Sequence, residues 1–362
     1  MHLKRNIMKK KLLVLLLALC LLASLPLATA CEKQPQGPSK YNAYSFDYFD
    51  TVTTIIGFAE SQEEFDRISG EVLAELGEYH RLFTIYHRFE GLENLCTINE
   101  LVDGAHRTVT VDRRIIDMLL YAKDMYEVTG GKVNVAMGSV LSIWHDYREE
   151  GMDEPWNAKL PPMDKLREAA EHTDIEKLVI DEENNTVTLT DPKMKLDVGA
   201  IAKGYAVEMV ARSLEGKGIT GYVLNVGGNV RAVGAKADGT PWTAGVENPA
   251  EEEDASYLAL LALDGRSLVT SGSYQRYYVV DGKRYHHIID PATLMPSEGF
   301  VSVSIVCPSS AQGDALSTAL FCMTYEQGLA LIESIPDAEA MWVLPDGTKY
   351  PSSGFGAYTV KE

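Results

Sequence analysis

Apolar residues recur at helical spacing directly after a glycine turn at position 199. An extended segment, residues 195–198, runs into Gly199, and the apolar residues then follow at Ile201, Tyr205, Met209, Val210 and Leu214. This pattern predicts that an extended strand enters a helix through the turn. The first-turn N–H groups of such a helix, with Lys203 one turn in, suit an anion, although a strand-to-helix junction without a ligand has the same pattern.

Three other segments have the pattern of helices. The first begins after Ser61, where Glu64 completes a capping-box pattern, and its apolar face consists of Phe65, Ile68, Val72, Leu76 and Tyr79. The second begins at Asp112 and is expected to stop at residues 130–131, with an apolar face of Ile115, Leu119, Ala122 and Tyr126. A late helix is expected from about Gln312.

Short runs of apolar residues predict strands, chiefly in the second half of the chain. The expected strands are 46–58, 178–180, 186–189, 221–226, 242–246, 258–263, 301–306 and 340–344, and a hairpin of 277–280 with 284–289 through Asp281-Gly282. Strands and helices do not alternate regularly. The pattern therefore predicts an α+β fold with mixed or antiparallel sheets and packed helices, and argues against a doubly wound fold.

The first thirty residues have the pattern of a targeting segment. Five cationic residues between positions 4 and 11 precede an apolar run, residues 12–25, which is short for a membrane span. Residues 27–31, Leu-Ala-Thr-Ala-Cys, resemble a bacterial lipobox, whose cysteine is lipidated. We expect a signal peptide over 1–30, lipidation of Cys31 and a tether over 31–40, with secretion by ordinary cleavage nearby as the alternative.

Net charge and cysteine content exclude some classes of protein. Removal of residues 1–30 takes the formal charge from -19 to -24, which disfavours nucleic acid as a partner and means that an anionic ligand would need a cation beside it. Cys96, Cys307 and Cys322 are far apart in the sequence, so buried thiols are expected instead of a zinc site or disulfide framework. We expect one domain over residues 41–362.

Two further motifs contain groups suited to chemistry. Asp314 and Thr318 lie four residues apart at the start of the late helix, so a carboxylate and a hydroxyl share one face and could bind Mg2+, although an acidic residue is also common at a helix start. His286 and His287 end the predicted hairpin before Asp290-Pro291. Either histidine could act as an acid or base at the rim of a sheet, or merely form a hydrogen bond there.

The order of the motifs is more specific than any one of them. The motifs are Asp197-Val-Gly-Ala-Ile-Ala-Lys-Gly-Tyr-Ala, Asn225-Val-Gly-Gly-Asn, Thr270-Ser-Gly-Ser-Tyr, His286-His-Ile-Ile-Asp-Pro and Asp314-Ala-Leu-Ser-Thr-Ala, preceded by Phe46-Asp-Tyr-Phe-Asp-Thr-Val and Gly131-Lys-Val-Asn-Val-Ala-Met-Gly. Over residues 41–345 the chain resembles the FAD:protein FMN transferase family, also called ApbE. The resemblance implies an ApbE-like, T-fold-like architecture.

The resemblance also implies roles for individual residues. Mg2+ would be bound by the carbonyl of Ala200 and the side chains of Asp314 and Thr318, and His287 would serve as base. FAD would be contacted at Phe49, Tyr86, Asn134, Lys203, Ala206 and Ile288. Phe49 stands where many members have Met, and Asn134 where many have Asp, so the two positions depart from the family pattern.

The implied activity is Mg-dependent transfer of FMN from FAD to a threonine hydroxyl of an acceptor protein, with release of AMP. Acceptors in this family are membrane-associated redox flavoproteins, and we expect the enzyme to be lipid-anchored on the extracytoplasmic face of the membrane. Hydrolysis of FAD to FMN and AMP would use the same site. A flavin-binding lipoprotein without catalysis is the remaining alternative, and it would need neither a metal nor a base.

Overall fold

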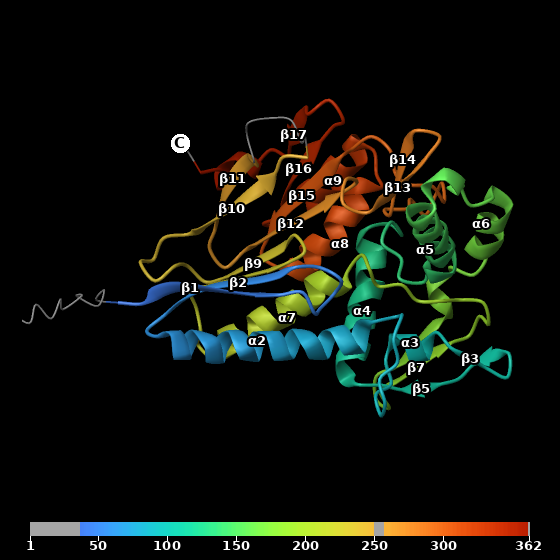
Figure 1. Cartoon of the computed structure of the whole chain (residues 1–362), viewed down its shortest axis with the longest axis horizontal. Coiled ribbons are helices and arrows are strands. Elements are labelled where there is room, and N and C mark those ends of the chain that lie inside the picture. Colours follow the sequence, from blue (N-terminus) through green and yellow to red (C-terminus); the bar gives the residue numbers. More distant parts are fainter. Residues whose placement is uncertain (1–36, 250–256, 361–362) are drawn as a thin grey trace, which may run out of the picture. The chain divides into compact units, whose positions relative to one another are not determined.

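Eight strands form one sheet in the order β1-β2-β8-β9-β12-β15-β16-β17, and each pair of neighbours is antiparallel (Figure 1). The structure, a computed structural model, describes residues 37–249 and 257–360. The strands are β1 (Ser39–Ser45), β2 (Thr53–Ala59), β8 (Tyr222–Val226), β9 (Asn229–Val233), β12 (Ser267–Gly272), β15 (Ser302–Cys307), β16 (Glu339–Val343) and β17 (Lys349–Pro351). The predicted α+β class with antiparallel sheets is confirmed.

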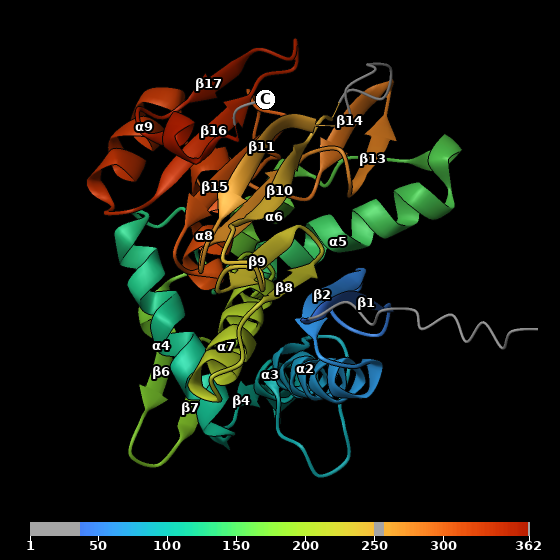
Figure 2. The same ribbon diagram turned by 90° about the vertical axis from the view of Figure 1, so that its left-hand side faces the viewer.

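One face of this sheet is covered by helices that follow the order of the strands. The helices are α2 (Gln62–Phe83) against β1 and β2, α7 (Ala202–Gly216) against β8 and β9, α8 (Ser310–Phe321) against β12 and β15, and α9 (Tyr325–Ser334) against β16. Figure 2 shows α7 below β8 and β9, with α4 (Arg113–Val128) beside α7. The main hydrophobic core lies between the helices and the sheet.

The opposite face of the sheet is covered by a smaller core. A separate hairpin, β10 (Trp242–Glu247) and β11 (Tyr257–Leu263), and the 3-10 helix η3 (Phe355–Tyr358) supply Trp242, Leu261 and Phe355 to it. Both faces of the central strands are therefore apolar. All six residues of β15 are buried, and β15 corresponds to the strand expected at 301–306.

A third apolar cluster joins the remaining elements. It unites α5 (Gly138–Asp153) and α6 (Met163–Ala170) with the hairpin of β13 (Tyr277–Val280) and β14 (Lys283–His286), and Trp144 Nε1 donates to the Leu294 carbonyl at 2.9 Å. The other short elements are α3 (Leu95–Ile98), β3 (Leu101–Val102), β4 (Ala105–His106), β5 (Val109–Thr110), η1 (Pro155–Asn157), η2 (Ile175–Lys177), β6 (Leu178–Asp181) and β7 (Thr186–Leu189).

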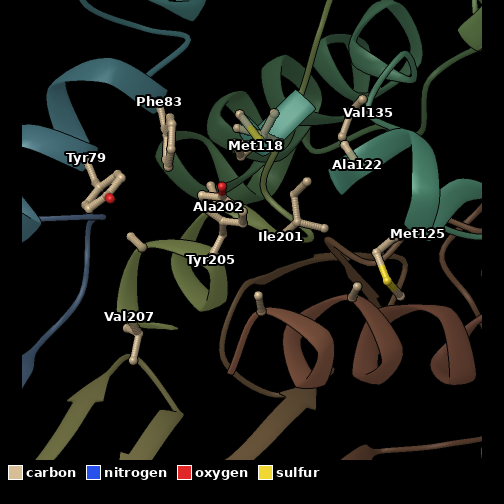
Figure 3. Packing of buried hydrophobic residues seen from close by; sticks show 14 of the residues in the cluster. Tyr79, Phe83, Met118, Ala122, Met125, Val135, Ile201, Ala202, Tyr205 and Val207 are labelled. Carbon is tan, nitrogen blue, oxygen red and sulfur yellow. The ribbon is translucent and has the colours of Figure 1, made fainter. Parts of the chain in front are cut away.

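Local sequence signals place the helix ends as predicted. The Ser61 side chain accepts the Glu64 N–H at the start of α2, and Asp112 caps α4 by accepting the Arg114 N–H. The apolar faces of α2, α4 and α7 then meet, as Figure 3 shows for Phe83, Met118 and Tyr205. Burying these faces, at about 25 cal/mol per Å2, stabilises the helices far more than helix propensity does.

Several predicted boundaries are wrong. The expected strand 46–58 is a turn over its first half, where Phe49 and Asp50 have positive φ angles of 57° and 50°, and β1 instead lies upstream, beginning at Ser39 within the expected tether. Residues 195–198 form only an isolated bridge from Lys195 to Met137. Strands β9 and β17 were also not predicted.

The expected signal peptide and the lipidation site at Cys31 lie outside the described residues. None of the helices within residues 37–249 and 257–360 is long and apolar enough to cross a membrane.

Candidate functional site

A cleft lies where several segments distant in the sequence converge. Its lining includes residues of the β1–β2 turn, α5, the start of α7, the end of β12, the segment after β14 and the middle of α8. The sequence motifs at 197–206, 225–229, 270–274, 286–291 and 314–319 each contribute residues to it. The motifs that are ordered along the chain are therefore gathered in space.

The Asp314 carboxylate is held in place by three hydrogen-bond donors. It is only 3% exposed, and its Oδ2 accepts the Gly204 N–H of α7 at 2.8 Å. Its Oδ1 accepts from Asn229 Nδ2 at 3.3 Å and from Lys203 Nζ at 3.5 Å. An ionised carboxylate has about four lone-pair positions, so the three donors leave one for a further partner in the cleft.

The groups around Asp314 suit a magnesium ion. Thr318 lies one turn further along α8 and lines the cleft with Ala200. The Oδ1 of Asn229, a residue 2% exposed, has no hydrogen-bond partner among the described residues. Oxygen donors of this kind are the ligands of Mg2+, which keeps several waters and needs few protein ligands. The described residues accordingly contain no group of three or more His, Cys, Asp or Glu placed to hold a metal.

His287 has the geometry of a base and lines the cleft. Its Nδ1 lies 3.2 Å from the carbonyl oxygen of Arg276, which can only accept, so the proton is on Nδ1 and Nε2 is free to take another. Burial, with the charge of Arg276 next in importance, lowers the pKa of His287 to about 3. The imidazole is therefore neutral near neutral pH.

His286 has no free nitrogen. Its Nε2 donates to the Ser297 carbonyl at 2.7 Å and its Nδ1 accepts the Ile288 N–H at 3.2 Å, while its ring packs edge-on against Phe321. It does not line the cleft. Of the two histidines that the sequence left open, the structure places only His287 in the site.

The cleft walls are cationic although the protein is acidic. Lys132, Arg148, Lys203 and Arg276 line the cleft, against the carboxylates of Asp197 and Asp314. Lys132 pairs with Asp290 at 2.7 Å, and Arg276 donates to the Asp50 carbonyl at 3.3 Å across the cleft. A second lobe with Phe49, His80 and Met152 in its walls shares Arg148, Lys203 and Arg276 with the first. An elongated anion could therefore extend across both lobes.

Most of the residues predicted for a flavin contact are brought together. Tyr86, Asn134, Lys203 and Ile288 line the main lobe. Phe49 lines only the second lobe. Ala206 is not brought together with them: it is fully buried in the main core and lines neither lobe.

A family model described as the ApbE family matches residues 49–342. The chain belongs to the ApbE family. An FAD:protein FMN transferase of Treponema pallidum is 35% identical over 68% of this chain and 70% of its own length, and one of Vibrio cholerae is 32% identical over 94% of this chain and 98% of its own length.

Solved structures of ApbE proteins have the same fold. The ApbE protein of Thermotoga maritima superposes with a TM-score of 0.76 at 27% identity, covering 89% of this chain and 100% of its own. The flavin transferase ApbE of Vibrio cholerae superposes with a TM-score of 0.73 at 26% identity, covering 89% of this chain and 99% of its own.

Sequence reasoning missed several residues of this ApbE cleft. Asp197 and Asn229 lie inside motifs that were identified but received no role, so their signal was present. Burial raises the pKa of the Asp197 carboxyl, and the hydrogen bond from the Gly199 N–H offsets only part of this rise. Arg148 and Arg276 lie outside regular patterns, and only tertiary structure brings them to the site.

Proposed function

We propose that this protein is an Mg-dependent enzyme that transfers FMN from FAD to a threonine hydroxyl of an acceptor protein and releases AMP. The observation that carries the proposal is the convergence of His287, Lys203 and Asp314 on one cleft in a member of the ApbE family. The curated relatives named FAD:protein FMN transferase support the reaction class. A purely flavin-binding protein would need neither the base nor the held carboxylate.

The charges of the cleft suit the pyrophosphate of FAD. A protein of formal charge -19 repels a dianion in general, but Lys132, Arg148 and Lys203 provide local positive potential within the cleft. Arginine and lysine donate charge-assisted hydrogen bonds to phosphate oxygens. These residues would hold the pyrophosphate, and Tyr86, which is 53% exposed, would offer its ring to the flavin.

His287 would act on the incoming hydroxyl. Its Nε2 takes the proton of the acceptor threonine while the threonine Oγ1 forms a bond to the FMN phosphorus, and the bond from that phosphorus to the oxygen bridging to AMP breaks. The Arg276 carbonyl stabilises the resulting imidazolium by accepting a hydrogen bond from its Nδ1–H. A neutral imidazole is the form that can accept a proton, and phosphoryl transfer depends chiefly on such positioning.

Asp314, Thr318 and the Ala200 carbonyl would hold the magnesium ion, with Asn229 beside them. When bound, the ion would supply Lewis-acid stabilisation of charge on the phosphate oxygens. Lys203 would exchange its contact with Asp314 for one with a phosphate oxygen, because the ion and the ammonium compete for the same carboxylate.

We propose that the acceptors are membrane-associated redox flavoproteins and that the enzyme is attached to the extracytoplasmic face of the membrane through lipidated Cys31. The lipobox-like Leu27-Ala-Thr-Ala-Cys31 supports this localisation.

Mass spectrometry of an acceptor domain provides the test. The acceptor is incubated with the enzyme, FAD and Mg2+, and a mass gain of one FMN on a threonine, with one AMP released per transfer, is expected. Free FMN and AMP without acceptor labelling would indicate hydrolysis instead, and intact FAD would reduce the function to binding. Asp314→Ala should abolish transfer, because it removes the charged ligand proposed for the metal.

A further inference from the structure

A buried polar ladder joins α7, α8 and β9 beneath the cleft. Its upper rung consists of Gly204, Asn229 and Asp314, and its lower rung of Glu208, Arg231 and Ser310. Each rung takes one residue from each element, and the rungs are four residues apart on the helices and two apart on the strand. These spacings put the members of an element on one face, so the two rungs lie one below the other.

The lower rung contains a buried ion pair between Glu208 and Arg231. Glu208 and Arg231 are 2% and 4% exposed, and their side chains meet at 3.1 Å. The Glu208 carboxylate also accepts the Ser310 N–H at 2.9 Å, which is a first-turn amide of α8. A carboxylate at this place satisfies an amide that has no partner within the helix and interacts favourably with the helix dipole.

The lower rung thereby sets how α8 sits on α7. Arg212 and Glu215 extend it to the surface, at 2.8 Å from Glu208 and 2.9 Å from Arg231. Burying two charges costs several kcal/mol per ion, and the mutual attraction repays that cost only with good geometry. Stability alone is therefore a weak reason for this pair. The pair is better explained if the lower rung fixes the position of Asp314, which lies one turn further along α8.

The upper rung acts directly on the carboxylate. Asn229 Nδ2 donates to Asp314 Oδ1, while the Asn229 Oδ1 has no partner among the described residues. An unpaired buried amide oxygen costs about 1 to 3 kcal/mol. Asn229 lines the cleft beside Asp314. A cation that binds Asn229 Oδ1, or a water on that cation that donates to it, would explain why this buried oxygen has no hydrogen-bond partner within the described part of the chain.

We propose that Asn229, Arg231 and Glu208 are positioning residues of the cation site, and that the polar ladder holds Asp314 in the orientation that binds the metal. The inference rests on the proposed function, since it concerns the same metal site. Partners of metal ligands typically contribute about 10- to 100-fold to metal affinity.

The test measures binding of Mn2+ alone by electron paramagnetic resonance of the free ion, together with thermal unfolding in the absence of metal. The double variant Glu208→Met/Arg231→Met removes both buried charges at similar volume, an exchange that often leaves stability unchanged or raised. We expect this variant and Asn229→Ala to bind Mn2+ about 10- to 100-fold more weakly, with the unfolding midpoint of the double variant retained. Arg113→Met/Asp117→Met, which removes an exposed pair on α4, is the matched control and should bind as the parent does.

Asp314→Ala distinguishes a failure of the metal site from a failure of the positioning role. If Asp314→Ala binds Mn2+ as tightly as the parent, the proposed metal site itself is wrong. If Asp314→Ala loses binding while the ladder variants retain the parental affinity, the polar ladder has no positioning role. Should the double variant fail to fold, Asn229→Ala removes the direct contact with Asp314 while leaving the buried ion pair in place. Weaker Mn2+ binding by that variant would support the proposal, and unchanged binding would overturn it.

Discussion

The adjacent residues His286 and His287 have opposite roles because they lie on opposite sides of one chain segment. His286 uses both ring nitrogens in hydrogen bonds to the backbone, so it fastens the segment after β14 to the rest of the fold. Within the described part of the chain, the His287 ring forms a hydrogen bond only through Nδ1, and the residue lines the cleft. One histidine thus stabilises the fold through hydrogen bonds and the other is a candidate base, because their side chains point in different directions.

His287→Asn should separate catalysis from binding. Asparagine retains a polar side chain but cannot take a proton near neutral pH, so the transfer rate should fall by about 100- to 10,000-fold. FAD affinity should change little, because the cationic residues that would hold the pyrophosphate remain. Rapid-mixing kinetics and FAD titration measure the two quantities. If His286→Asn instead abolishes transfer in a folded protein while His287→Asn does not, the assignment of the base is wrong.

The stability of the protein should depend on the protonation of His287. Its folded-state pKa, about 3, lies below the value near 6.5 in an unfolded chain, so the unfolded chain binds more protons between these two values. The contribution of His287 to stability is therefore fully present above about pH 6.5 and decreases as the pH falls toward 3.

Urea unfolding at several pH values measures this dependence. Between about pH 4 and 6 the free energy of unfolding of His287→Asn should vary less with pH than that of the parent, by up to about 1.4 kcal/mol per pH unit for one proton. Equal slopes for the two proteins would show that the folded-state pKa of His287 is not depressed.

Helices α7 and α8 approach each other at a glycine, and the site depends on this contact. A Cβ at Gly204 would lie 2.4 Å from both the Asp314 Cβ and the Ser310 carbonyl oxygen, so only glycine fits here. The same close approach lets the Gly204 N–H reach the Asp314 carboxylate at 2.8 Å. The motif glycine thus serves helix packing and the orientation of a candidate metal ligand together.

Gly204→Ala should therefore destabilise the protein by about 1 to 3 kcal/mol, because a side chain forced into a packed interior displaces its neighbours. Gly216→Ala at the other end of α7 is the matched control: a Cβ there meets no atom within 4 Å, and alanine should be neutral or stabilise by up to about 1 kcal/mol. Chemical denaturation of both variants provides the measurement. Equal stabilities would contradict the close packing of α7 on α8.

The protein as a whole is acidic, whereas its candidate site is lined by cationic side chains. An acidic protein that gathers Lys132, Arg148, Lys203 and Arg276 around one cleft can attract an anion to that cleft. The fold achieves this by drawing the four cations from four separate segments. Because salt screens this local potential, added salt should weaken the binding of FAD. The acidic surface does not favour contact with an anionic membrane, so a lipid chain is the proposed attachment.

Cys31→Ser tests the proposed attachment. The variant should leave the membrane fraction, or stall during processing, because the hydroxyl cannot be lipidated at this position. The specific activity of the purified soluble protein should equal that of the parent, since the cleft is built from residues beyond position 39. Fractionation of cells and an acceptor-labelling assay measure the two outcomes. Normal maturation with unchanged membrane association would eliminate the lipoprotein proposal.

Local signals in the sequence were sufficient to predict α2, α4, α7 and α8, but not α3, α5, α6 and α9. Capping residues such as Ser61 and Asp112, and apolar residues at helical spacing, act within a few positions of one another and can be recognised without the fold. The spacing of Asp314 and Thr318 placed them on one face of a helix for the same reason. The order of the motifs then indicated the family.

Tertiary structure alone decided what depends on distant contacts. Whether His286 or His287 enters the cleft, why Ala206 does not, and that Arg276 spans to the β1–β2 turn all follow from packing between segments far apart in the sequence. The turn at Phe49 and Asp50 was also missed, because its positive φ angles are maintained by surrounding contacts and not by glycine. Short-range periodicity determines which face of an element is apolar, whereas the direction of a single side chain depends on neighbours brought together only by folding.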